Sequence, residues 1–330
     1  MLKLLKYLFI IFILISIFGY YKYSSLENRF LNENKNIEVI SGDTLTNVLV
    51  NQFGYNKIFL KIYFKINKDK SINIQAGNYS FSSGENINDI IKTFTKGTKA
   101  LEEKITILEG WNIYDIDEYL TSLNLIEKGT FISKAKNIDE FKSEYTFLNG
   151  FISLEGFLYP DTYFVNKNTF ILDDFIKQML KNFKQKVFVN LLYTLDEDNL
   201  KEVMILSSIV EKEEKNDLER PTVAGILKKR LKNNWMIGAD ITACYAFEIT
   251  SKECQKNLVR YIYEKNDYNT RTMTGLPKTP INNPSISSIE AVLNSDNNTP
   301  YWYYLHDNNG KIHYGKTNEE HIQNKNNYLK

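Results

Sequence analysis

Histidine, cysteine and net charge are all scarce in this sequence, and each scarcity argues against a class of function. The histidines are His306, His313 and His321, spread over predicted strand and helix ends, so histidine-based catalysis is disfavoured. Cys244 and Cys254 lie ten positions apart without a CxxC motif or a nearby histidine, which disfavours a metal site and leaves a disulfide or two free thiols open. The formal net charge is +1 and no basic stripe is visible, so nucleic acid is not an expected partner. No metal or cofactor is implied.

Long apolar runs are also rare, and the clearest one lies near the N-terminus. Residues 7–21 read YLFIIFILISIFGYY, carry no charge and follow Lys3 and Lys6. A spanning helix needs about 20 residues, and flanking leucines and snorkelling lysines extend this run toward that length. Positive charge before the run predicts that the chain after Lys22 lies outside the cytoplasm. No small-x-small site follows, so an uncleaved anchor is preferred over a signal peptide.

A small module is expected after this anchor. Residues 1–23 are assigned to the cytoplasmic tip and anchor, 24–36 to a polar linker and 37–98 to the module. The residue patterns predict a strand, two helices, a strand and a further helix, at 37–40, 45–53, 58–66, 76–81 and 87–94. That order resembles a LysM-like module, a fold that binds glycans containing N-acetylglucosamine. A spacer that only holds the following domain away from the membrane is the open alternative.

Residues 99–330 are expected to form a larger mixed domain, which makes the fold class α+β. A strand-like run at 104–108 precedes helices, and an Asn-Asn-Gly turn near the C-terminus predicts a hairpin. The predicted helices and hairpin strands are 113–123, 130–136, 170–189, 285–293, 303–305 and 312–314. At the centre, residues 202–231 predict two helices joined by a polar turn, with Pro221 at the start of the second.

The first central helix ends in a run of charge, Glu211-Lys212-Glu213-Glu214-Lys215. Carboxylates there face the negative end of the helix dipole, which raises the cost of ionising them, and a protonated carboxyl is what a general acid needs. At about 100° per residue, Glu213 lies on the apolar stripe, whereas Glu211 lies over Ser207 and Ser208, where small side chains leave room for a ligand. Periodicity thus favours a buried Glu213 and a groove-facing Glu211. An ordinary solvated helix end is the alternative.

Several segments together resemble the endolytic murein transglycosylase (YceG-like) family. The matching elements are SIVEKE (208–213) with ERP (219–221), EGWN (109–112), LEGFLYPDTY (154–163), YNT (268–270) and the Pro-rich run 275–284. The family's catalytic acid is the first glutamate of IVEKE, which here is Glu211. A further family element retains Asp240, Thr242 and Tyr245. Its usual Gln, Ser and Pro are replaced by Gly238, Ala239 and Ile241, which removes two hydrogen-bonding side chains.

The resemblance implies a set of site residues. Glu211 is the expected catalytic residue, and the expected substrate-binding residues are Glu155, Glu213, Asp240, Thr242, Tyr245 and Asn269.

The resemblance also implies a lyase that cleaves peptidoglycan strands between MurNAc and GlcNAc. Glu211 would protonate the glycosidic oxygen and then help to remove the proton of the 6-hydroxyl as it closes on C1, leaving 1,6-anhydro-MurNAc ends. Cutting nascent strands in this way would terminate their elongation at the bacterial cell membrane, outside the cytoplasm and beside peptidoglycan synthases.

Two alternatives stay open. One is a hydrolase with two carboxylates roughly 5 to 9 Å apart, for which Glu155 or Asp240 would partner Glu211. The other is a non-catalytic cell-wall-binding scaffold in which the LysM-like module carries the activity.

Overall fold

The computed structural model describes residues 2–40, 42–67, 74–96 and 102–329. The chain divides into two compact units, residues 1–104 with 164–170, and residues 105–163 with 171–330. The predicted boundary between residues 98 and 99 lies outside the described residues. The architecture is mixed α+β, with an apolar N-terminal helix and three separate two-stranded sheets among the described residues.

The first unit contains the predicted strand, helices and strand in the predicted order. Its elements are α1 (Leu2–Glu27), β1 (Lys35–Val39), α2 (Leu45–Asn51), α3 (Lys57–Ile66), β2 (Gly77–Phe81) and α4 (Ile87–Lys96). β1 and β2 are antiparallel, with Ile37 opposite Tyr79. Thr44 and Asn56 cap α2 and α3 by accepting bonds from backbone N–H groups of their first turns. The alternating side chains of the strands pack on α2 and α4, where Phe94 contacts the rings of three core residues, Phe53, Tyr79 and Phe81.

Helix α1 is longer than the apolar run alone suggests. Its segment Lys6–Glu27 is long and apolar enough to cross a membrane. The helix ends by burying Leu26 in the core of the first unit. Beyond it, Leu31 exchanges backbone hydrogen bonds with Gly84 and Glu85. Leu26 and Leu31 are therefore held by the module, whereas most other residues of the expected polar linker 24–36 are exposed.

The second unit is built around a helical centre. Its helices and hairpin strands are α5 (Ile113–Ser122), α6 (Thr130–Lys136), α7 (Asp139–Lys142), η2 (Thr146–Leu148), α8 (Leu172–Phe183), η4 (Lys184–Leu192), α9 (Glu197–Glu213), α10 (Arg220–Lys232), α11 (Thr242–Tyr245), α12 (Ser251–Tyr261), α13 (Ile286–Leu293), β5 (Tyr303–His306), β6 (Ile312–Gly315) and α14 (Asn318–Tyr328). The strands β3 (Glu102–Thr106) and β4 (Thr162–Asn166) contribute residues to both units, and η3 (Lys167–Thr169) belongs to the first. The division between the units falls within the paired strands β3 and β4.

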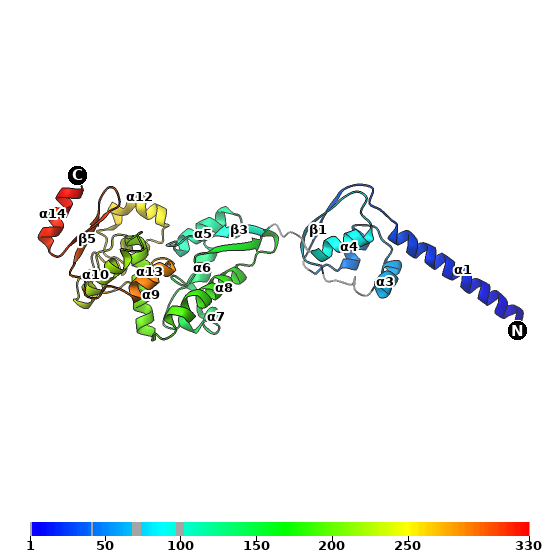
Figure 1. Cartoon of the computed structure of the whole chain (residues 1–330), viewed down its shortest axis with the longest axis horizontal. Coiled ribbons are helices and arrows are strands. Elements are labelled where there is room, and N and C mark those ends of the chain that lie inside the picture. Colours follow the sequence, from blue (N-terminus) through cyan, green and yellow to red (C-terminus); the bar gives the residue numbers. More distant parts are fainter. Residues whose placement is uncertain (1, 41, 68–73, 97–101, 330) are drawn as a thin grey trace. The chain divides into compact units, whose positions relative to one another are not determined.

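Helices α9, α10 and α13 pack against one another at this centre (Figure 1). Gly225 permits the close approach, since a Cβ atom there would lie 2.2 Å from the carbonyl oxygen of Asp296, just after α13. The predicted long helix 170–189 is instead α8 followed by the π-helical segment η4. The C-terminal hairpin β5–β6 and the capping of α14 by Thr317 agree with the sequence-based expectation.

A disulfide settles the question about the cysteines. Cys244 and Cys254 are bonded and join α11 to α12. Both are buried, together with Ala243 and Tyr261, in a small hydrophobic cluster.

Candidate active site

Glu211 lies in the last turn of α9, and its carboxylate is held by several donors. Oε2 accepts hydrogen bonds from the backbone N–H of Ser285 at 2.9 Å, the hydroxyl of Ser285 at 2.6 Å and the hydroxyl of Ser288 at 2.7 Å. Oε1 lies 3.6 Å from Nη2 of Arg220, and both side chains are 7% exposed. The carboxylate thus lies at the N-terminus of α13. The dipole of α13 presents its positive end to Glu211, whereas the dipole of α9 presents its negative end.

The segment before α13 explains how this arrangement forms. Ser208 lies one turn before Glu211 on the same face of α9. Its hydroxyl accepts a bond from the N–H of Ile281, and its carbonyl accepts one from the Asn282 side chain. Ser207 and Ser208 are fully buried. The prediction that these small residues leave room for a ligand is therefore wrong, because both are buried and the Pro-rich chain packs directly on Ser208.

Arg220 is the buried cation of the site. Its guanidinium donates to the carbonyl of Glu214, the carboxylate of Asp217, and the hydroxyls of Ser285 and Ser287. These bonds fix the turn between α9 and α10 against the start of α13. The ERP element thereby places a positive charge beside Glu211.

Asn283 joins three of the sequence elements singled out above. Its side-chain oxygen accepts from the N–H groups of Gly156 and Leu158, and its amide donates to the Trp111 carbonyl at 3.0 Å. Its own carbonyl accepts from the N–H of Gly110. Gly110 has φ +72°, and a Cβ atom there would lie 3.3 Å from Cγ of Glu211. The loop that begins at Glu109 is thus packed against the candidate catalytic side chain.

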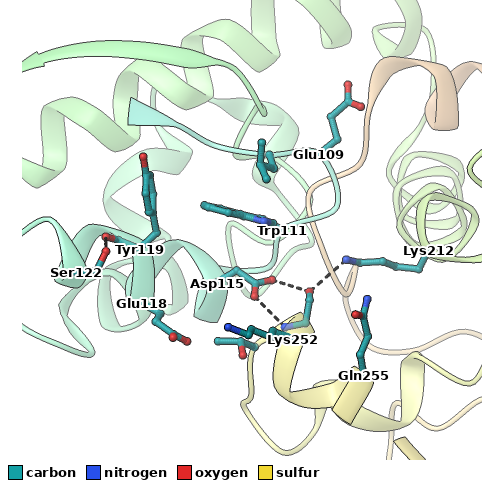
Figure 2. A pocket seen from close by; sticks show the side chains of 12 residues that line it. Glu109, Trp111, Asp115, Glu118, Tyr119, Ser122, Lys212, Lys252 and Gln255 are labelled. Atoms are coloured by element: carbon teal, nitrogen blue, oxygen red, sulfur yellow. Dashed lines mark hydrogen bonds between the residues drawn. The ribbon is translucent and has the colours of Figure 1, made fainter. Parts of the chain in front are cut away.

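A cavity of about 520 Å³ opens beside this loop (Figure 2). Trp111 and Tyr119 form part of its wall, with ring centroids 5.2 Å apart in an edge-to-face arrangement. Figure 2 shows Trp111, Tyr119 and Asp115 along one side and Lys212 and Gln255 on the other. Aromatic faces among polar groups suit a sugar ring, which has apolar faces and a hydroxylated edge.

The two sides of the cavity are linked by a polar network. Lys212, next to Glu211, donates to the hydroxyl of Ser251 at 3.2 Å, and that hydroxyl donates to Asp115 at 2.6 Å. Asp115 also closes the capping box of α5 with Asn112. Burial lowers the pKa of Lys212, and the negative charges of Asp115 and Glu211 oppose that shift.

Glu109 is a second carboxylate at this site that the sequence analysis did not assign. It lines the cavity, and its pKa is raised first by burial and then by the negative charge of Glu211. The EGW element was the signal that could have identified it. Sequence position alone did not show that this loop packs on α9.

Glu213 faces a different part of the domain. It lines a separate cavity of about 370 Å³ together with Asp240, Arg230 and Arg271. Burial raises the pKa of Glu213 to about 6. The hydroxyl of Tyr304 donates a 2.8 Å hydrogen bond to its carboxylate, which lowers the pKa and so opposes this shift. The predicted burial of the Glu213 carboxyl is therefore confirmed, but polar groups, among them Tyr304 of the C-terminal hairpin, surround it where apolar packing was expected. Asp240 is paired with Arg271.

The other predicted substrate-binding residues lie in the interior. Glu155, Thr242 and Asn269 are fully buried, and Tyr245 is 7% exposed. Glu155 accepts bonds from the N–H of Ile113, the hydroxyl of Tyr245 and the amide of Asn283, at 3.0, 2.8 and 3.0 Å.

Thr242 bonds Thr270 and the Ala239 carbonyl, and the amide of Asn269 donates to the carbonyls of Ile262 and Glu264. Because Glu155, Thr242 and Asn269 are fully buried, the expectation that they contact substrate directly is wrong. Their hydrogen bonds hold neighbouring segments of the domain together. Throughout the described ranges, no three His, Cys, Asp or Glu side chains converge as a metal site would require.

The comparisons with known proteins agree with this geometry. The family model described as the YceG-like family matches residues 37–327. An endolytic murein transglycosylase of Bacillus subtilis is 29% identical over 273 residues, covering 77% of this chain and 73% of the relative.

Other relatives are longer or structurally characterised. An endolytic murein transglycosylase of Streptococcus pneumoniae strain R6 is 25% identical over 283 residues. The match covers 76% of this chain and 50% of that relative. The crystal structure of a yceG-like protein from Listeria monocytogenes superposes with a TM-score of 0.58 at 25% identity, covering 88% of this chain and 99% of that one. With the family model matching most of its length, this chain belongs to the YceG-like family.

Proposed function

We propose that this protein is a lytic transglycosylase that acts on the glycan strands of peptidoglycan, with Glu211 as its acid. The observation that carries the proposal is the position of Glu211: a firmly held carboxyl packed against the loop that forms the wall of an aromatic-lined cavity. The relatives named endolytic murein transglycosylase support it.

The chemistry requires one carboxyl that changes roles. Protonated Glu211 gives its proton to the glycosidic oxygen as the bond from C1 of MurNAc to that oxygen breaks. The 6-hydroxyl oxygen of the same sugar then bonds to C1, and its proton passes to the Glu211 carboxylate. The product is a 1,6-anhydro-MurNAc end, no water is consumed, and Glu211 regains its starting state. Ser285, Ser288 and Arg220 hold the carboxylate in one orientation while it exchanges protons.

The hydrolase alternative now rests on a different carboxylate. Glu155 is fully buried, and Asp240 pairs with Arg271 in the cavity that also contains Glu213. Neither is placed to act with Glu211. Glu109 feels the charge of Glu211 and reaches the cavity, so it is the candidate base if water attacks C1.

Digestion in heavy-oxygen water distinguishes the two reactions. The full-length chain in detergent is incubated with purified sacculi, and the released muropeptides are analysed by mass. The lyase yields unlabelled anhydro ends, one water lighter than reducing ends. Labelled reducing ends as the main product contradict the proposal, whereas Glu109→Gln leaving anhydro product intact supports the single-acid mechanism.

The rest of the chain supports a cell-surface location. We propose that α1 anchors the protein in the cell membrane with the remainder outside the cytoplasm, where strand cleavage terminates glycan elongation beside peptidoglycan synthases. The Cys244–Cys254 disulfide fits that location, since disulfides persist in oxidising compartments.

The order β1, α2, α3, β2 with antiparallel strands supports a LysM-like module over residues 37–98, ahead of a catalytic domain over 99–330. Retention of the purified chain on chitin oligosaccharides tests whether the module binds glycan. Loss of retention together with loss of cleavage on Glu211→Gln would instead assign that binding to the active site.

A further inference from the structure

Helix α3 of the first unit exposes a row of isoleucines. Ile58, Ile62 and Ile66 follow one another at intervals of four residues and are 68%, 43% and 64% exposed. Residues four apart share a helix face, so the three form one continuous apolar ridge. Leu60 and Tyr63, on the other side of the helix, are fully buried in the core. The ridge is therefore not needed to hold α3 in place.

Lysines accompany the ridge along its length. Lys57, Lys61 and Lys65 have the same four-residue spacing, one position ahead of each isoleucine, and all are exposed. A helix with an apolar row flanked by lysines is typical of helices that lie in the interface of a membrane, where the lysines meet anionic headgroups.

The position of α3 along α1 sets its depth. The two helices pack together within the first unit. The rings of Tyr23 and Tyr63 have centroids 6.0 Å apart, and the Asn67 side chain donates to the hydroxyl of Tyr23 at 3.1 Å. These contacts join the C-terminal end of α3 to α1 at Tyr23, two residues after the uncharged run 7–21 ends.

The side chains of α1 at this level are those of a membrane boundary. Tyr20 and Tyr21 are 75% and 67% exposed, and Lys22 follows them. Tyrosines concentrate at the headgroup level of membrane proteins, and lysines extend toward the water there. Helix α3 is tied to the next residue, Tyr23, and is therefore held at headgroup depth.

We propose that the outer face of α3 lies on the membrane surface, with Ile58, Ile62 and Ile66 inserted among the lipids and the three lysines on anionic headgroups. This inference rests on the proposed membrane anchor. It makes the first unit a part that is held down on the bilayer instead of a freely swinging spacer.

The test places an environment-sensitive fluorophore on Ile62→Cys of the full-length chain. The native cysteines are bonded to each other, so the label attaches to the new residue alone. Ser80→Cys, exposed on β2 of the same unit, is the matched control. Both proteins are reconstituted into vesicles of equal parts phosphatidylglycerol and phosphatidylcholine. Quenching by nitroxide-labelled lipid is compared with quenching by aqueous iodide, after equal thermal melts show that both variants are folded.

We expect lipid nitroxide to quench the label at position 62 and iodide to reach it poorly, with the reverse at position 80. In phosphatidylcholine alone, lipid quenching at position 62 should fall, and unchanged quenching would overturn the role of the lysines. Equal iodide quenching at both positions would overturn the proposal, and so would a label at 62 that is shielded from both quenchers, since a protein would then cover the ridge. Flotation with the vesicles is measured first, so a failure of the anchor is distinguishable from a failure of α3 to dock.

Discussion

Glu211 and Glu213 lie two residues apart on α9 and face different surroundings. Glu211 accepts bonds from Ser285 and Ser288 beside the 520 Å³ cavity, whereas Glu213 accepts one from Tyr304 beside the separate 370 Å³ cavity. Their separation follows from helix geometry, because residues two apart point to nearly opposite sides.

Exchanging each for glutamine separates their roles. Glu211→Gln keeps the shape of the side chain but cannot donate the proton, so we expect anhydro-muropeptide release to fall about 10²- to 10⁴-fold with little change in melting temperature. Glu213→Gln should leave most activity and show mainly a stability change. Muropeptide release and thermal melts of both variants check this, and the reverse pattern would exchange the two assignments.

Glu155 makes the stability of the fold depend on pH. Burial raises its pKa from 4.5 to about 8, although the Ile113 N–H and the Tyr245 hydroxyl oppose the shift. Between these two pH values the folded state holds a proton that the unfolded state releases. The contribution of Glu155 to the free energy of unfolding is therefore fully present below pH 4.5 and is lost as the pH rises through about 8. Denaturant unfolding between pH 5 and 9 should show stability falling with pH.

Glu155→Gln is the control for this dependence, because an amide does not titrate. Glu213, with its own raised pKa of about 6, contributes in the same direction over a lower range, so the difference between the wild type and the variant isolates Glu155. We expect the variant to be less stable by about 1 to 3 kcal/mol at low pH, since its amide donor faces groups that also donate. A variant with the same pH slope as the wild type would rule out Glu155 as the source.

Sequence reasoning at the residue scale identified Glu211 and missed its partners. The identification came from a contiguous motif, which a sequence displays directly. Ser285, Ser288 and Asn283 reach the site through packing between segments more than 70 positions apart, and periodicity along one helix contains no information about such contacts. For the same reason, Glu155 was expected at the groove and lies in the interior.

At the scale of elements, α13 links catalysis to folding. Its first residues supply both hydroxyls that hold Glu211, and the Ser285 hydroxyl also accepts the N–H of Ser288 as the cap of the helix. The predicted helix at 285–293 is confirmed, but its function as a support for Glu211 appears only when α13 packs on α9.

Two alanine variants separate capping from positioning. Ser285→Ala and Ser288→Ala each remove one hydroxyl bond to Glu211, and both should lower kcat more than they change KM. Only Ser285→Ala also removes the cap, which should cost about 1 kcal/mol more in the free energy of unfolding. Kinetics on soluble glycan strands and denaturant titrations provide the comparison. Unchanged kcat in both variants would exclude a positioning role for α13.

The Cys244–Cys254 disulfide is a second link between elements, because it joins α11 to α12. It fixes α12, which contributes Ser251, Lys252 and Gln255 to the wall of the cavity. Replacing Cys244 and Cys254 together by alanine should lower stability by about 2 to 3 kcal/mol, as expected for a closed loop of this length. We expect KM to rise because the wall loosens. A melting temperature that is insensitive to both the double variant and reducing agent would show that the bond does not stabilise the protein.

At the scale of the whole chain, the order and type of the elements were largely predictable, whereas their boundaries and contacts were not. Strand alternation, helix caps and the hairpin turn are local signals, and the elements that depend on them were confirmed. Residues 24–36 were predicted to be a polar linker, and most of them are exposed to solvent. Leu26 and the backbone of Leu31 are nevertheless held by the module, through contacts that join residues more than 50 positions apart.

This packing bears on whether the N-terminal helix remains in the mature protein. Helix α1 continues without a break from the apolar run to Glu27, and it ends with Tyr23 on Tyr63 and Leu26 in the core. Cleavage after residue 21 would free the end that holds these two contacts, and the sequence there has no small-x-small site.

We therefore expect N-terminal sequencing of protein purified from membranes to find the chain beginning upstream of the apolar run, and carbonate washing to leave it in the membrane fraction. A version starting at Lys22 should melt at a lower temperature than the full chain, because the first unit loses the helix that supports Tyr23 and Leu26. Recovery of a mature protein that begins beyond Tyr21 would mean that the run is a signal sequence, and the ridge on α3 would then have no anchor to hold it at the bilayer.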